Sequence, residues 1–253
     1  IAAATTFPRR EPHAGTTGRR PTATLLALGL VGGSIPFVLF FEGLARASST
    51  QAAFIHKTLL LWVAALAVPL LRERVGLPHL GAFALLIAGQ AALTGGSGGF
   101  GWGAGESMVL AATLLWAVEL VIAKRLLRSF GSSTLAVARM GVGSVALLGW
   151  LAVTDRLELL LGLGASQWAW ALGTGAILAA FVGTWFAALA RAQAVDVTAV
   201  LVFGAVVTGV LASGVQGAPL ASQAPGLLLV TVGTAIIAAT ALRPVPAPAR
   251  ETT

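Results

Sequence analysis

The sequence contains no cysteine and few charged residues. The absence of cysteine in all 253 residues excludes disulfide bonds and thiolate metal sites. Only 10% of the residues are charged and 57% are hydrophobic, whereas roughly 25% of a typical soluble domain is charged. A water-soluble protein of this length needs more charge to cover its surface. A chain whose outer surface faces lipid does not, so the composition favours a membrane protein.

Recognisable sites for metals and nucleotides are also missing from the sequence. The three histidines, His13, His56 and His79, lie far apart and form no ligand cluster. The Gly-rich stretch 95–105 has no lysine where a phosphate-binding loop requires one and follows no strand. We therefore expect neither a metal nor a cofactor. The net charge of +7 comes from basic residues beside apolar blocks, so we expect a membrane partner rather than nucleic acid.

The apolar residues are grouped in blocks of membrane-spanning length. A helix needs about 20 residues to cross a hydrocarbon core of about 30 Å at 1.5 Å per residue. The blocks lack the alternation of a transmembrane β-barrel. We predict an all-α, polytopic transmembrane bundle of about eight helices, the third of them short. The predicted helices are residues 23–41, 52–71, 79–94, 105–123, 134–153, 168–190, 197–215 and 225–242.

The positions of lysine and arginine predict the orientation in the membrane. If the N-terminal tail is cytoplasmic and each helix reverses direction, Arg46 and Arg156 lie outside and Lys57 and Arg139 lie within helices. The other twelve of the 16 basic residues then lie inside. This agrees with the positive-inside rule. We therefore expect a multi-pass protein of the inner membrane with both termini in the cytoplasm.

The sequence carries a weak internal repeat at an offset of 145 residues (189 minus 44). Because an odd number of crossings separates the copies, the first starts inside and the second starts outside. Inverted repeats of this kind build alternating access in many secondary carriers. The matched positions are residues 44–47 (LARA) with 189–192, Phe41 with Phe186, residues 66–67 with 211–212, and Gly81 with Gly226.

Residues 40–89 (FFEGLARASSTQAAFIHK and onward) resemble the three closing helices of an EamA domain of the drug/metabolite transporter superfamily. Residues 184–215 (TWFAALARAQAVDVTAVL and onward), with the following helix, resemble the same unit again. The family has two five-helix domains and cytoplasmic termini. The family's Leu-Gly-Glu ending is half kept in each copy, and its mid-helix proline is replaced by Leu60 and Ala205.

The resemblance implies how the chain is divided. It implies that the two opening helices of the first domain are absent and that the chain, which begins with Ile1, starts partway through its gene product. The expected parts are a cytoplasmic segment 1–22, the last three helices of a first EamA-like domain at 23–94, a Gly-rich linker at 95–104, a second EamA-like domain at 105–243 and a cytoplasmic tail at 244–253.

Ionisable residues inside apolar helices are costly, so each is a candidate for the substrate or proton pathway. Glu42 and Lys57 have matching depth near the outer side, where they either form an ion pair or leave Lys57 to extend to the interface. Glu119 and Arg139 form a second expected pair, with a structural salt bridge as the simpler interpretation. His56 can couple proton movement to transport or can simply be hydrogen-bonded.

Aromatic residues inside the helices are the remaining candidates. Trp62 and Trp116, with Trp185, either line a cavity or fill the core of the bundle. Asp196 lies at a helix start, where the helix dipole accounts for it. The candidate pathway residues are thus Glu42, His56, Lys57, Trp62, Trp116, Glu119 and Arg139.

The leading functional hypothesis is a secondary carrier that exports amino acids, metabolites or lipophilic drugs, with proton antiport as a candidate driving force. Its expected partners are a small-molecule substrate and the lipid bilayer, and a homodimer is left open. One alternative is a non-transporting membrane partner or a lipid flippase-like subunit. An intramembrane enzyme is disfavoured, because the acids are scattered and cysteine is absent.

Overall fold

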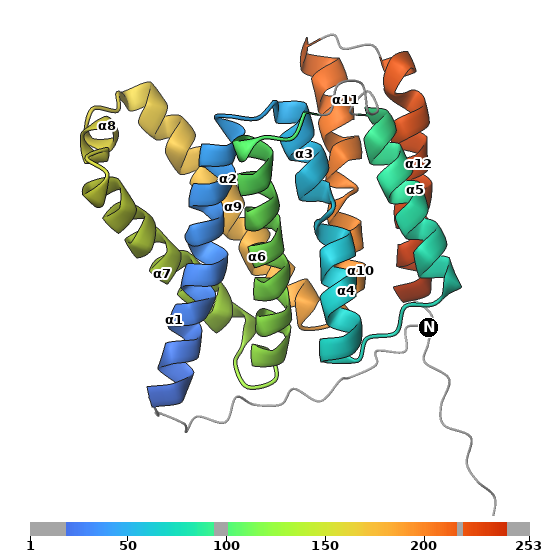
Figure 1. The fold of residues 1–253 in the computed structure, drawn as a ribbon, viewed down its shortest axis with the longest axis horizontal. Coiled ribbons are helices and arrows are strands. Elements are labelled where there is room, and N and C mark those ends of the chain that lie inside the picture. Colours follow the sequence, from blue (N-terminus) through green and yellow to red (C-terminus); the bar gives the residue numbers. More distant parts are fainter. Residues whose placement is uncertain (1–18, 94–100, 217–219, 242–253) are drawn as a thin grey trace, which may run out of the picture.

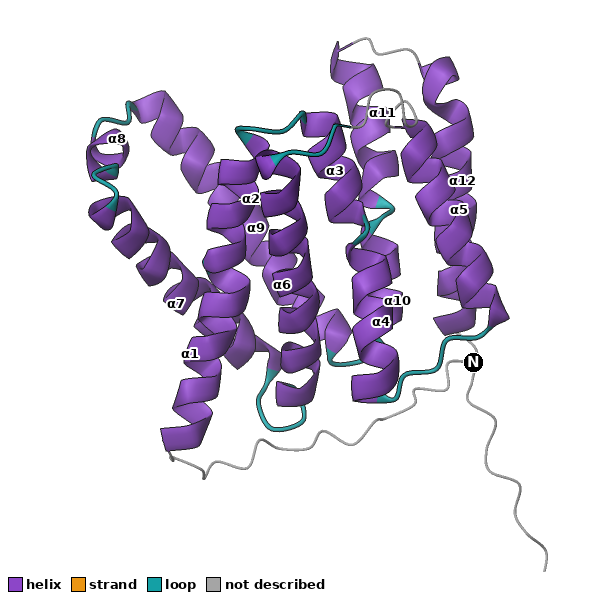
Figure 2. Cartoon of the chain, in the orientation of Figure 1, coloured by secondary structure: helices purple, strands orange, loops and turns teal. Residues whose placement is uncertain are grey.

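The computed structural model describes residues 19–93, 101–216 and 220–241, and every regular element in these ranges is a helix. Figure 1 shows the helices standing side by side in one bundle, and Figure 2 shows short loops between the helices where the connection is described. The helices are α1 (Arg19–Gly33), α2 (Ile35–Leu44), α3 (Ser49–Lys57), α4 (Leu59–Leu71), α5 (Leu77–Leu93), α6 (Ala104–Leu126), α7 (Ser132–Val153), α8 (Leu157–Leu161), α9 (Ala165–Leu189), α10 (Ala194–Leu201), α11 (Gly204–Gln216) and α12 (Leu220–Ala241).

Seven helical segments of the described chain are long and apolar enough to cross a membrane, and α5 is a shorter apolar helix. The seven are Thr22–Leu44, Ser49–Leu71, Ala104–Leu126, Ser132–Val153, Ala165–Leu189, Ala194–Leu211 and Gln223–Ala241. Each matches one predicted crossing to within a few residues. The prediction of an all-α membrane bundle with a short third helix is therefore confirmed.

Successive spans alternate in direction, so the connections are divided between two ends of the bundle (Figure 1). We call the end with the α4–α5, α6–α7 and α9–α10 connections the basic end, because it carries Arg72, Arg74, Arg128 and Arg191. The opposite end holds Arg46 and Arg156. The first span of the unit α1–α5 begins at the basic end, whereas the first span of the unit α9–α12 ends there. The two units therefore have opposite orientation.

The repeat is visible in the helix boundaries as well as in the sequence. The ends of α2 and α4, Leu44 and Leu71, recur 145 residues later as the ends of α9 and α11, Leu189 and Gln216. The starts of α3 and α4 recur in the same way as the starts of α10 and α11. Local sequence and local geometry thus repeat together in two inverted units.

Each unit also contains a span that is broken near its middle. In the first unit α3 ends and α4 begins around Thr58, where the amide of Leu61 donates to the Thr58 carbonyl at 2.8 Å. In the second unit α10 ends and α11 begins around Phe203, where the amide of Val206 donates to the Phe203 carbonyl at 2.9 Å. These bonds join residues three apart, as in a 3₁₀ turn. Such a turn inside a helix often marks a hinge.

The bundle is held by three extensive helix contacts, α5 with α12, α2 with α6 and α1 with α7. The last one brings backbones together at Gly33 and Gly143, where a Cβ added to Gly143 would lie 2.5 Å from the Gly33 carbonyl oxygen. Small residues allow this close approach. The resulting van der Waals packing holds the helices together in lipid, where no hydrophobic driving force acts between them. The main core includes Leu28, Leu60, Leu120 and Phe186.

Candidate functional site

The centre of the site is a buried ion pair between α6 and α7. Arg139 Nε donates to Glu119 Oε1 at 2.6 Å, and Arg139 Nη2 lies 3.5 Å from Glu119 Oε2. The Arg139 side chain is 5% exposed and that of Glu119 is fully buried. The predicted contact between these two residues is thus present. Such a pair keeps two charges inside an apolar bundle at lower cost than either charge alone.

Helix α1 covers this ion pair with two glycines. A Cβ at Gly32 would lie 2.2 Å from the carboxyl carbon of Glu119, and one at Gly33 would lie 2.3 Å from the Arg139 carbonyl oxygen. Any larger residue at Gly32 would displace the carboxylate. The glycines therefore allow α1 to close directly over the pair.

Aromatic rings surround the guanidinium group of Arg139. Its Cζ lies 5.7 Å from the ring centroid of Phe37 and 5.8 Å from that of Trp185, within cation–π range. Trp116 packs edge-on against Phe37 at 5.4 Å, and its Nε1 donates to the Gly32 carbonyl at 3.1 Å. Trp116 thereby belongs to the same cluster as the ion pair, as the sequence suggested for a cavity wall or core.

Three buried nitrogens of this cluster have no hydrogen-bond partner among the described residues. They are Arg139 Nη1, Trp185 Nε1 and His56 Nδ1. The His56 ring lies 5.0 Å from that of Trp116 and 5.4 Å from that of Phe40. Unsatisfied buried polar atoms are costly and often mark sites that bind a further group. The ion pair, the aromatic rings and His56 together form what we call the central cluster, with members on α2, α3, α6, α7 and α9.

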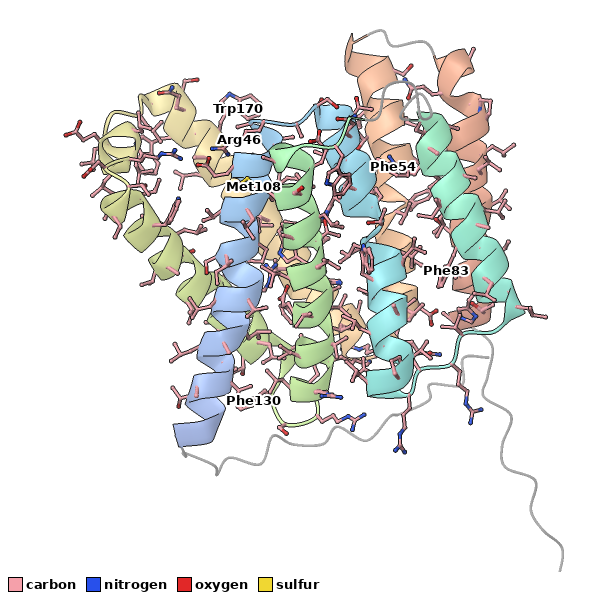
Figure 3. The ribbon with its side chains drawn as sticks, viewed as in Figure 1. Arg46, Phe54, Phe83, Met108, Phe130 and Trp170 are labelled. Carbon is pink, nitrogen blue, oxygen red and sulfur yellow. The ribbon has the colours of Figure 1, made fainter. Side chains whose placement is uncertain are left out.

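At the opposite end, Glu42 has partners other than Lys57. Glu42 pairs with Arg46 at 2.8 Å and with Arg156, so of the two alternatives for Glu42 and Lys57 the ion pair between them is wrong. Lys57 forms no ion pair within the described residues and is half-buried. The reason is reach: Arg46 is one helical turn from Glu42, and Arg156 comes from the α7–α8 connection. Figure 3 shows Arg46 at this end beside Met108, whose sulfur lies 3.8 Å from Arg46 Nη1.

Trp62 lies outside the central cluster. Its side chain is 38% exposed, and its Nε1 donates to the Thr58 hydroxyl at 3.1 Å, directly after the break between α3 and α4. It therefore faces the outside of the described bundle. A role for Trp62 in a pathway stays a prediction.

The structure also brings together a pair that sequence reasoning missed. His79 Nε2, from α5, lies 3.3 Å from Asp196 Oδ1 at the start of α10, and both side chains are largely buried. His79 Nδ1 accepts from the Gly76 amide at 3.3 Å, so Nε2 is the ring nitrogen that faces the carboxylate. The signal in the sequence was an acid inside an apolar run, which the helix dipole alone had explained.

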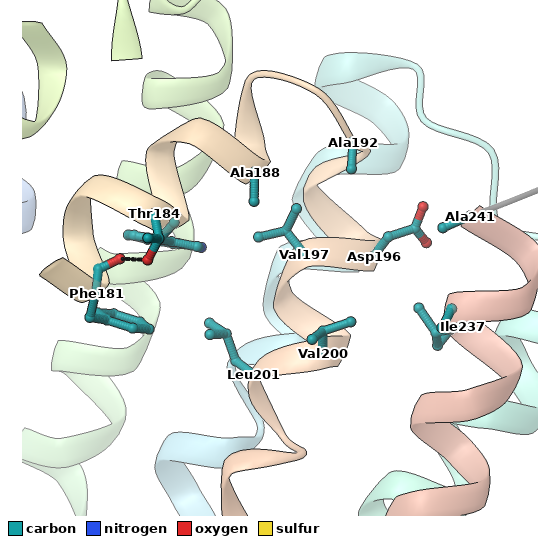
Figure 4. A pocket seen from close by; sticks show the side chains of 12 residues that line it. Phe181, Thr184, Ala188, Ala192, Asp196, Val197, Val200, Leu201, Ile237 and Ala241 are labelled. Carbon is teal, nitrogen blue, oxygen red and sulfur yellow. Dashed lines mark hydrogen bonds between the residues drawn. The ribbon is translucent and has the colours of Figure 1, made fainter. Parts of the chain in front are cut away.

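An apolar groove lies between α9, α10 and α12, with Asp196 at one end (Figure 4). It encloses a cavity of about 370 Å³. Two groove residues of α9 and α10, Ala188 and Val200, correspond at the repeat offset to Gly43 and Ile55 of the first unit, which pack against α6. The lining residues are Phe181, Thr184, Trp185, Ala188, Ala192, Asp196, Val197, Val200, Leu201, Ile237, Ala238 and Ala241.

Comparisons with known proteins agree with this architecture. One solved structure, described only as "Crystal structure of protein", superposes with a TM-score of 0.67 at 21% identity, over 90% of this chain and 80% of its own. This likeness concerns the fold alone. No curated protein matches the chain. The profile of the EamA-like transporter family matches residues 3–95 and 103–239, which include both inverted units. A multi-pass helical chain matched twice by this profile belongs to the EamA-like transporter family, whose members are transporters and not enzymes.

Proposed function

We propose that the protein is a secondary carrier that exports small organic solutes such as amino acids, metabolites or lipophilic drugs. The observation that carries this proposal is the pair of broken spans, α3–α4 and α10–α11, at equivalent positions of two inverted units. Discontinuous helices at a repeat interface are where many secondary transporters bind substrate, and inversion lets the two units exchange roles during alternating access.

The central cluster is the proposed substrate site. Arg139 has one nitrogen without a partner, which suits the carboxylate of an amino acid or an organic acid. Phe37, Trp116 and Trp185 offer ring faces for the apolar part of the solute. In the described conformation the cluster is buried, so the carrier must open along the α1–α7 or α2–α6 contacts to admit a solute.

The basic end is the proposed cytoplasmic side of the inner membrane. It carries Lys124 and Arg125 in addition to the arginines that define it, whereas the opposite end carries two arginines that share one carboxylate. Under the positive-inside rule this distribution supports the proposal that both termini are cytoplasmic.

His56 is the proposed proton-coupling residue. Its ring packs against Trp116 in the central cluster, its Nδ1 lacks a partner among the described residues, and it is one residue before the end of α3. An imidazole at a helix break can exchange a proton with either side when the hinge moves. Lys57 is the adjacent candidate, because it has no counter-ion in the described part of the chain.

The test is solute flux in proteoliposomes with an imposed pH gradient, using a panel of labelled amino acids, organic acids and lipophilic cations. We expect gradient-driven flux of at least one class, lost in Arg139→Lys, which keeps the charge but not the planar fork. His56→Gln should retain flux down a solute gradient while losing the response to the pH gradient. Flux that keeps its full proton dependence in His56→Gln would remove His56 from the mechanism.

A second candidate function is a lipid flippase-like or non-transporting subunit, favoured by the apolar groove between α9 and α12. In the same proteoliposomes, movement of a fluorescent phospholipid between leaflets with no flux of any soluble solute would support this alternative. Solute flux without lipid movement would support the carrier.

A further inference from the structure

A second cavity, of about 420 Å³, lies at the basic end of the bundle. Its walls come from the α4–α5 connection, from α6 and the turn that follows it, and from the α9–α10 junction. It is lined by five basic side chains and a single carboxylate. We call these residues the basic pocket: Leu71, Arg72, Glu73, Arg74, Lys124, Arg128, Arg191, Ala192 and Gln193.

The one carboxylate of the basic pocket is already used for another purpose. Glu73 Oε1 accepts from the Ala194 amide at 2.7 Å, and Oε2 accepts from the Val195 amide at 3.0 Å. Both oxygens therefore cap the first turn of α10. Arg72, Arg74 and Arg128 form no ion pair within the described residues. The pocket thus presents positive charge that the described protein does not neutralise.

The remaining two cations are fixed in place with donors to spare. Lys124 Nζ donates to the carbonyls of Leu189 and Ala192, each at 2.6 Å, and an ammonium group has three N–H donors. Arg191 Nη1 donates to the Ala187 carbonyl at 2.7 Å, which leaves most of its five N–H groups free. These backbone carbonyls thus position the two cations and leave N–H groups for a ligand.

The location of the pocket identifies the kind of anion. The spans Ser49–Leu71, Ala104–Leu126 and Ala165–Leu189 end beside it, and the span Ala194–Leu211 begins beside it. Ends of apolar spans lie at the level of lipid headgroups, and basic pockets between helices at that level suit anionic headgroups. Guanidinium groups also match phosphate oxygens in pairs.

We propose that the basic pocket binds the phosphate of an anionic lipid headgroup. The bound phosphate bridges the two inverted units, because the α4–α5 connection already touches the α9–α10 junction, where the Arg74 amide donates to Gln193 Oε1 at 3.2 Å. Lipid in this pocket therefore stabilises the basic end of the carrier in the described conformation, in which the central cluster is buried.

The test measures lipid binding to the purified full chain in detergent, by native mass spectrometry and by thermal unfolding. The probes are phosphatidylglycerol, phosphatidylcholine as the zwitterionic comparison, and inorganic phosphate alone. The pocket variant is Arg72→Gln/Arg74→Gln; Gln is unbranched at Cβ and so suits Arg72, whose φ is 57°. The matched control is Arg19→Gln/Arg20→Gln, which removes the same charge at the start of α1.

The wild type and the control should retain phosphatidylglycerol in preference to phosphatidylcholine. Each arginine near an anionic surface contributes about a fivefold effect, so the pocket variant should lose about 25-fold in affinity. Equal losses in the two double variants, or no lipid preference in the wild type, would overturn the proposal. If inorganic phosphate raised the unfolding temperature as much as the lipid does, the lipid assignment would be overturned and the pocket would be a site for a soluble anion.

A folding defect is separated from a binding defect by Arg72→Lys/Arg74→Lys. This variant keeps the charge and loses only the paired guanidinium geometry, so it should bind phosphatidylglycerol two- to threefold more weakly than the wild type. Wild-type binding by the Gln variant would also overturn the proposal. No transport measurement enters the test, so its failure does not depend on the carrier function.

Discussion

The two inverted units share their local geometry but differ in what covers them. In the first unit α6 packs against α2, α3 and α4, and fills the groove between them. In the second unit the corresponding surface of α9 and α10 remains a groove. Ile55 packs beside α6 and is 4% exposed, whereas Val200, its counterpart 145 residues later, is 46% exposed.

This difference teaches that the repeated sequence determines where the helices end and where they are broken. The neighbouring helices determine how far each side chain is buried. Phe41 and Phe186 are identical residues at matched positions, yet Phe41 is 61% exposed and Phe186 is fully buried in the main core. Helix α9 packs against α7, whereas α2, its equivalent in the first unit, makes no extensive contact with α7 in the described chain. Equivalent sequence therefore gives equivalent backbone without equivalent packing.

The largest expected effect comes from breaking the ion pair between Glu119 on α6, the helix that covers the first unit, and Arg139 on α7. Glu119→Leu leaves the Arg139 charge buried without its partner, which should cost about 3–5 kcal/mol of stability. Thermal unfolding in detergent, followed by tryptophan fluorescence, measures the loss. The double variant Glu119→Leu/Arg139→Leu is the control, because it removes both charges and should recover most of the stability. A single variant as stable as the wild type would show that the pair contributes nothing.

The next effect tests the comparison directly with two matched variants. Gly43→Leu places a side chain against α6, where even a Cβ would lie 2.8 Å from the Gly105 carbonyl oxygen, and should cost about 1–3 kcal/mol. Ala188→Leu introduces leucine at the equivalent position of the second unit, where the side chain faces the groove. It should leave the unfolding temperature nearly unchanged. Equal losses in the two variants would mean that the groove is filled in the folded protein.

Much of the fold could be predicted from the sequence, because lipid imposes a strict relation between apolar length and helix span. The contact between Glu119 and Arg139 was predictable for a related reason, since two charges at similar depth in a hairpin have few other partners. The partners of Glu42 were not, because Arg156 comes from a connection whose path depends on the tilt of α7 and α9. The pair of His79 and Asp196 depends on the packing of α5 near α10, which spacing along the chain does not reveal.

A smaller loss of stability is expected at the contact between the two units that His79 of α5 and Asp196 of α10 form. Asp196 occupies the place that the neutral Gln51 holds in the first unit, and its partner His79 comes from α5. His79→Leu removes the imidazole nitrogen that lies 3.3 Å from the carboxylate and should cost about 1 kcal/mol. Asp196→Asn/His79→Leu, which removes the charge as well, should be closer to the wild type in the same unfolding measurement. If His79→Leu alone matched the wild type, the two side chains would not be coupled.

The smallest effect is expected where charges pair in solvent. Arg156→Gln removes one of two arginines that share Glu42, and the Arg156 side chain is 49% exposed. Arg46 remains 2.8 Å from the carboxylate, so no buried charge is left without a partner. Unfolding temperatures of wild type and variant should differ slightly at low salt and coincide at high salt, because salt screens exposed pairs. A loss as large as that of Glu119→Leu would mean that the α7–α8 connection closes the opposite end of the bundle. The two sites use the same residue types and differ in two respects: Glu42 keeps a second arginine after the substitution, and it lies among water and headgroups, whereas the pair of Glu119 and Arg139 lies between apolar helices.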